Sequence, residues 1–175
     1  MNHEYPYICN VRPQDIAILL KIVCYNKQRW YNAQLAGDLL LSPGEISYSL
    51  QRSAYSGLID GEKKKVRTQA LLEFLIYGMP YVFPQHPASI SRGMPTAHSH
   101  PFMQAQFSSE QLYVWPDADS DERGQSVEPL YPGAVKAAKK DEQLYLMLAL
   151  ADVLRVGKTR EKQTAIKKYK ELFGL

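Results

Sequence analysis

Three histidines carry the strongest metal-binding chemistry in this sequence: His86, His98 and His100. Imidazole nitrogen is a common zinc ligand. His98 and His100 are two residues apart, a spacing that places both side chains on one face only in a strand. No cysteine or carboxylate stands within the short spacing typical of zinc sites. We therefore expect exposed loop histidines and no metal.

Four acidic residues follow part of the spacing of a calcium-binding EF-hand loop. Asp117, Asp119, Asp121 and Glu128 stand at its positions 1, 3, 5 and 12. Position 6 needs glycine for a sharp turn, yet Glu122 stands there. We expect an acidic surface loop at this place rather than a calcium site.

Motifs for covalent or phosphate chemistry are missing from the sequence. It contains no Gly-x-Ser-x-Gly elbow, no P-loop and no dinucleotide-binding glycine pattern. A trio of His, Asp and Ser can be chosen from almost any sequence of this length and indicates nothing. The expectation is a protein that is not an enzyme and needs no cofactor.

Composition indicates a folded protein of the cytoplasm. With 45% hydrophobic and 22% charged residues, the 175-residue chain can fill a core. No apolar run reaches eighteen residues, and no basic stretch followed by an apolar one marks a secretion signal. The two cysteines, Cys9 and Cys24, are too few for a disulfide framework, and Cys24 lies in an apolar run typical of a buried reduced thiol.

Charge is distributed unevenly over three segments. Residues 1–83 carry a net +2, residues 84–133 a net −4 and residues 134–175 a net +5. The two basic end segments, on either side of an acidic middle segment, indicate that one or both ends bind nucleic acid. We divide the chain at the same places, into an N-terminal helical domain, an irregular Pro- and Gly-rich segment, and a C-terminal pair of helices. The predicted fold is mainly α.

Helical periodicity is clear from residue 13 onwards. Pro13 and Asp15 begin a first helix whose two sides are both apolar. Such a helix requires a cover from beyond the N-terminal domain, either the C-terminal helices or a second subunit. A second helix begins near Asn32. Ser42 can cap the amide of Glu45, whose carboxylate reaches back, while Pro43 takes the first position of a third helix. A fourth covers about residues 68–77.

The second and third of these helices form the most informative pattern. They are joined by only two or three residues around Leu41, which forces a sharp corner and leaves the third helix projecting. Ala36 is small where the helices must approach each other, and Ile46 is a branched apolar residue where the projecting helix must be anchored. The sequence from Asn32 to Leu58 resembles bacterial winged helix-turn-helix regulators of the MarR-like kind. This resemblance covers about residues 11–78.

In that family the third helix enters the major groove of DNA. The resemblance implies that its outward side contacts bases through Ser47, Tyr48, Gln51 and Arg52. Arginine pairs with guanine, glutamine with adenine, and hydroxyls with bases or phosphates. Amides at the helix starts, near Asn32 and at Ser42-Pro43-Gly44, can hold phosphates.

The stretch 59–67 occupies the position of the family's wing. Asp60-Gly61 signals a turn, and a basic run follows that suits phosphates. Its members are Lys63, Lys64, Lys65 and Arg67. Because this wing is shorter than is common in the family, we expect it to contact phosphates rather than to read bases.

Two helices are expected in residues 134–175. The first, residues 141–156, is apolar almost all round and belongs to a core or an interface; Asp152 and Arg155 form a structural pair in it. The second, residues 159–173, is amphipathic and basic. We expect these helices to mediate a homodimer, since bacterial operators are commonly read by two-fold dimers.

The sequence therefore predicts a cytoplasmic, sequence-specific regulator of transcription that binds double-stranded DNA, most simply a repressor. The alternative is a protein-interaction module, such as an antitoxin that neutralises a partner toxin through the middle segment. A metal-dependent enzyme is a much weaker third hypothesis. No membrane association is expected.

Overall fold

The computed structural model of the protein describes residues 10–175. Cys9 and the N-terminal stretch to which the secretion-signal prediction applies lie outside this range. In chain order the elements are α1 (Pro13–Cys24), α2 (Asn32–Leu39), α3 (Pro43–Tyr55), α4 (Thr68–Glu73), the π-helical turn η1 (Phe74–Gly78), α5 (Met79–Val82), β1 (Ile90–Pro95), the 3-10 turn η2 (Ala97–Ser99), α6 (Pro101–Gln104), β2 (Tyr113–Pro116), β3 (Arg123–Ser126), α7 (Ala134–Ala138), α8 (Glu142–Val156) and α9 (Thr159–Phe173).

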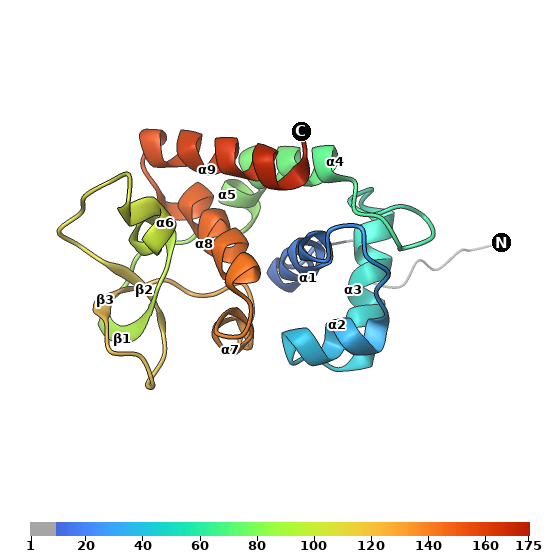
Figure 1. The fold of residues 1–175 in the computed structure, drawn as a ribbon, viewed down its shortest axis with the longest axis horizontal. Coiled ribbons are helices and arrows are strands. Elements are labelled where there is room, and N and C mark those ends of the chain that lie inside the picture. The colour runs from blue at the N-terminus through green and yellow to red at the C-terminus, as the bar shows by residue number, and fades with distance from the viewer. Residues whose placement is uncertain (1–9) are drawn as a thin grey trace.

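The described chain is mostly helical and carries one small three-stranded sheet. Figure 1 shows the sheet at one end of the long axis and the α2–α3 pair at the other, with α1 and α8 between them. Helix α9 crosses one side of the molecule and contacts α4. Buried apolar residues from α1 to α9 form one continuous cluster, so the N-terminal and C-terminal parts share a hydrophobic core.

Helix α1 lies at the centre of that core, as its two apolar sides predict. Residues 16–20 have no solvent exposure, because α2 and α3 pack on one side of the helix and α8 on the other. Of the two covers expected, the C-terminal helices provide one through α8. Cys24, near the end of α1, is a half-buried free thiol, and burial raises its pKa to about 12.

The fourth helix is shorter and more irregular than its periodicity predicts. Helix α4 ends at Glu73 and continues as the π-helical turn η1 and then as α5, instead of stopping at Gly78. Glycine suits position 78 in this path, because a Cβ there would come within 2.8 Å of the Phe74 ring. Pro80 does not break the chain of hydrogen bonds because it stands in the first turn of α5, where no amide is needed.

The prediction of an irregular segment at residues 84–133 is wrong, because a small closed sheet forms there. Strand β1 pairs antiparallel with both β2 and β3, and these two pair parallel with each other. Two glycines permit this closure: a Cβ at Gly93 would lie 2.0 Å from the Trp115 carbonyl oxygen, and one at Gly124 would lie 2.5 Å from that of Leu112. The fold is accordingly mixed: mainly helical, as predicted, but with one small sheet that was not predicted.

The expectation of exposed loop histidines is wrong for His98 and His100, which are both buried beside the sheet. The Nε2 of His98 lies 2.7 Å from the Gln111 carbonyl oxygen, and its ring contacts Tyr113. The Nδ1 of His100 accepts the Phe102 amide and so caps α6, while the ring contacts Tyr145. Burial lowers the pKa of His100 from its ordinary value of 6.5 to about 4.

The C-terminal region contains α7 in addition to the two helices expected there. The apolar run of α8 belongs to the protein's own core. Asp152 is buried on α8 and accepts hydrogen bonds from Thr96, Trp115 and Arg155 at 2.8, 2.6 and 2.9 Å. The expected Asp152–Arg155 pair is therefore present, and the hydrogen bond from Trp115 of β2 to Asp152 ties α8 to the sheet. No helix within residues 10–175 is long and apolar enough to cross a membrane.

The burial of His100 predicts a loss of stability in mild acid. The folded protein keeps this imidazole neutral down to about pH 4, whereas the unfolded chain protonates it near pH 6.5. The unfolded state therefore binds the extra proton first, and the free energy of unfolding falls as pH decreases through that window, by about 1–3 kcal/mol from this group. Urea denaturation at a series of pH values measures the slope.

The variant His100→Asn keeps a cap acceptor for the Phe102 amide but cannot titrate. Its stability should depend less on pH between 6.5 and 4 than that of the parent protein. His86→Asn, which changes an exposed histidine, is the matched control. If the free energy of unfolding changed equally with pH in the parent and in His100→Asn, His100 would not be the cause of the loss of stability in acid.

Candidate nucleic-acid interface

Helix α3 begins with the capping box that its sequence predicts. The Ser42 hydroxyl accepts the Glu45 amide at 3.2 Å, and the Glu45 carboxylate accepts the Ser42 amide at 2.9 Å. Hydrogen bonds from the Ser42 amide and hydroxyl to the carboxylate lower the pKa of Glu45. The preceding corner is tight because Leu40 takes a left-handed conformation, with φ of 57°. Helices α2 and α3 are thus joined by residues 40–42, as the short connection requires.

The outward side of α3 carries polar side chains, as expected. Ser47 and Tyr48 are exposed and Gln51 is half-exposed. Within residues 10–175 none of the three makes a side-chain hydrogen bond or an ion pair. Ile46 and Leu50 hold the opposite side in the core. The helix therefore presents a row of hydroxyl and amide groups that are not used by the described part of the chain.

The expected outward position of Arg52 is wrong. Its guanidinium points toward α1, where Nε and one terminal nitrogen donate to the two carboxylate oxygens of Asp15 at 2.8 and 2.6 Å. Asp15 has no solvent exposure and Arg52 only 9%. The hydrogen bonds to Asp15 raise the pKa of Arg52. Because a buried carboxylate needs a paired charge, Arg52 anchors α3 instead of projecting from it.

The two helix starts differ in their capacity to hold a phosphate. At α3 the Ser42 amide already donates to the Glu45 carboxylate and the Glu45 amide to the Ser42 hydroxyl. Pro43 has no amide proton, so Gly44 alone is left. At α2, Tyr31 rather than Asn32 is the capping residue, and no side chain caps the helix. Asn32 is exposed as the first helical residue. The start of α2 is therefore the better of the two phosphate positions.

The stretch expected to be a wing forms a compact turn. Ile59 and Val66 form a single β-bridge, and the Asp60 carboxylate accepts the amides of Lys64 and Lys65 at 2.7 and 3.1 Å. These two hydrogen bonds lower the pKa of Asp60. Lys64, Lys65 and Arg67 are exposed and Lys63 is half-buried. The turn is as short as the sequence indicates, and it directs its cations to solvent.

Two exposed cations that sequence reasoning missed, Lys27 and Arg29, stand on the loop between α1 and α2. The Lys64 ammonium stands 5.6 Å from the centre of the Trp30 ring, and the Arg29 guanidinium stands 5.1 Å from that of Tyr31. The loop between α1 and α2 therefore adjoins the turn. We call the combined feature the basic surface; it consists of Lys27, Arg29, Lys63, Lys64, Lys65 and Arg67. The sequence feature that could have indicated the cations of this loop is the run of basic and aromatic residues at 27–31.

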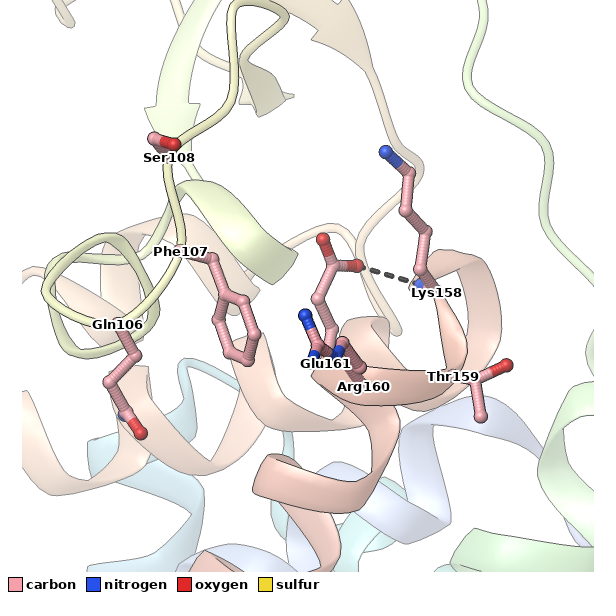
Figure 2. A pocket seen from close by; sticks show the side chains of 7 residues that line it. All are labelled: Gln106, Phe107, Ser108, Lys158, Thr159, Arg160 and Glu161. Carbon is pink, nitrogen blue, oxygen red and sulfur yellow. Dashed lines mark hydrogen bonds between the residues drawn. The ribbon is translucent and has the colours of Figure 1, made fainter.

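A surface cavity of about 480 Å³ lies at the start of α9, far from this interface. Figure 2 shows the Phe107 ring beside Glu161, with the Lys158 ammonium pointing away. The Glu161 carboxylate accepts the Lys158 amide at 2.7 Å and thus caps α9. The lining brings together no nucleophile and base. Within residues 10–175 no three His, Cys, Asp or Glu side chains are grouped to hold a metal.

The anchoring role of Arg52 leads to a stability prediction. Arg52→Ala leaves the Asp15 carboxylate buried without its partner and should lower the free energy of unfolding by about 3–5 kcal/mol. Urea denaturation followed by circular dichroism measures this change. Gln51→Ala, at the neighbouring half-exposed position, should change it by less than about 0.5 kcal/mol. An Arg52→Ala protein as stable as its parent would exclude the anchor.

Comparisons of the chain with protein-family models, with curated proteins and with solved structures find no match. The assignment of this surface consequently depends on its own geometry. That geometry consists of a capped helix with unused polar groups, an uncapped helix start and an adjoining basic surface.

Proposed function

We propose that this chain is a winged helix-turn-helix protein that binds double-stranded DNA and regulates transcription in the cytoplasm, most simply as a repressor. One observation carries the proposal. Ser47, Tyr48 and Gln51, on the outward side of α3, make no side-chain hydrogen bond or ion pair within residues 10–175, and the basic surface lies on the adjoining turn and loop. Amide and hydroxyl groups beside a cluster of cations match the two kinds of contact that DNA requires.

The proposed complex divides these contacts between elements. The major groove of B-DNA admits one α-helix, and α3 enters it with Ser47, Tyr48 and Gln51 toward the base edges. The uncapped start of α2 and the basic surface hold phosphates on either side of the groove. Arg52 takes no part in reading bases. A repressor of this kind needs no cofactor, because binding alone obstructs access to the promoter.

The basic surface gives a test through salt. Each phosphate that a protein neutralises adds about 0.9 to the slope of log affinity against log salt concentration. Replacing Lys63, Lys64 and Lys65 together with alanine should therefore weaken binding and reduce that slope by roughly 2–3. Fluorescence anisotropy with a duplex from the region upstream of the chain's own gene measures both quantities over a range of salt concentrations.

A matched control removes the same charge from the far side of the molecule. The triple alanine variant of Lys158, Arg160 and Lys162 changes the start of α9, at the other end of the long axis from α3. It should leave the salt slope close to that of the parent. Equal losses in the two triple variants would mean that only net charge matters, and the proposed interface would be wrong.

A second candidate function, binding to a protein partner, is favoured by one apolar patch. Tyr77, Tyr81 and Val82 are 73%, 81% and 55% exposed, and residues 74–91 contain no Lys, Arg, Asp or Glu. Exposed apolar surface of this kind is typical of interaction sites. A second copy of the chain is one such partner, as a homodimer would require, and a toxin is another. The core position of α8 makes this patch a better dimer surface than that helix.

Sizing distinguishes these partners. Sedimentation of the purified 19.9-kDa chain at micromolar concentration should give twice the monomer mass if the patch joins two copies. The variant Tyr77→Ser/Tyr81→Ser should then sediment as a folded monomer. A strictly monomeric parent would exclude the homodimer and leave the patch to a different protein, which should co-purify with the chain.

A further inference from the structure

We infer that the base pairs contacted by α3 are A·T pairs, so that the preferred DNA sites of this protein are A·T-rich at those positions. This inference rests on the proposed function and adds the class of sequence that the same surface selects. It comes from the chemistry of the side chains that α2 and α3 leave exposed.

Neither helix offers the side chains that bind guanine best. Guanine is most often read by Arg or Lys, which donate to its O6 and N7 atoms. Helix α2 contains no Lys or Arg, and α3 contains only Arg52. That guanidinium is buried and gives two hydrogen bonds to Asp15. A projecting helix without a free cation cannot make the most common contact to a G·C pair.

The groups that remain favour adenine and thymine. The amide of Gln51 can pair with N6 and N7 of adenine, and the ring of Tyr48 offers an apolar contact to the methyl group of thymine. Ser47 is compatible with either kind of base pair.

Cytosine would require an acceptor such as Glu45. One Glu45 oxygen, however, already accepts both the amide and the hydroxyl of Ser42, at 2.9 and 2.8 Å. The carboxylate is held at the cap by these hydrogen bonds and is therefore not positioned to accept from the amino group of cytosine.

The basic surface also favours A·T-rich DNA. A-tracts have a narrow minor groove with an enhanced negative potential, which attracts Arg and Lys. Arg67, Lys64 and Lys65 are exposed on a turn next to the helix pair. If the turn lies over the adjacent minor groove, its cations gain more from A·T-rich flanks than from mixed sequence.

Selection from a pool of duplexes with a randomised centre tests this inference. The full chain is incubated with the pool at moderate salt, bound duplexes are recovered, and the enriched sequences are read. A·T pairs should dominate a short central motif. In the enriched duplex, replacing thymine with uracil, which lacks the methyl group, or adenine with 7-deazaadenine, which lacks N7, should each weaken binding.

Variants at one position assign the preference to α3. Gln51→Ala should reduce the discrimination against a G·C substitution at one base pair by roughly 5- to 150-fold. Gln51→Arg should shift the preferred base at that position from adenine to guanine. Gln163→Ala, at an exposed glutamine on α9, is the matched control and should leave the motif unchanged.

The outcomes separate the two levels of the hypothesis. An A·T motif that changes with Gln51 supports the inference. Enrichment of G·C pairs, or a motif that does not change with Gln51, overturns the inference while DNA binding stands. If the parent protein enriches no sequence and binds no duplex in a salt-dependent way, the proposed function fails, and the inference fails with it.

Discussion

The ion pair between Arg52 and Asp15 fixes the rotation of α3 against the core of the protein. Two parallel hydrogen bonds hold the guanidinium in one orientation, and the carboxylate that receives them has no exposure to water. Successive residues of an α-helix are separated by about 100° around its axis. At that spacing Arg52 stands at the edge of the buried side that Ile46 and Leu50 define, so its ion pair holds the helix in the rotation that leaves the polar side chains outward. Rotating the helix would leave a charge buried and unpaired, at a cost of several kcal/mol.

The same anchor links α3 to the centre of the molecule. Asp15 also accepts the Arg12 amide at 2.8 Å, so a single carboxylate begins α1 and fixes α3. At the other end of α1, Lys21 lies 3.1 Å from Asp38 of α2 and 2.7 Å from Asp141, the residue that caps α8. The position of the α2–α3 pair relative to the C-terminal helices is thus set by charged contacts as well as by the shared core.

Local features of this fold could be predicted from the sequence because their causes are local. The Ser42 capping box needs residues three apart, and the two apolar sides of α1 are visible in twelve consecutive residues. The buried position of Arg52 could not be predicted, because its partner Asp15 is 37 residues away and a charged residue on a polar helix is usually exposed. The basic surface was only partly predicted, since Trp30 joins Lys64 to a different loop.

The sheet was missed for a different reason. Its strands are four to six residues long and show little alternation between apolar and polar residues. Its closure depends on Gly93 and Gly124, which have the sequence character of loop residues. The two histidines beside it are buried through contacts with residues at least 13 positions away in the sequence, such as Gln111 and Tyr145. The residues next to each histidine in the sequence do not indicate such distant contacts.

The distribution of charge around α3 has a consequence for how any DNA complex would gain its selectivity. Cations of the basic surface that contact phosphates strengthen binding to all duplexes alike, because phosphates are the same in every sequence. Neutral amide and hydroxyl groups on α3 would have to supply the differences between sequences, and such groups discriminate only when they are held in a defined position. The buried Arg52 supplies that rigidity. An arginine that would bind guanine strongly from the surface instead contributes by fixing the helix on which the weaker, more selective groups stand.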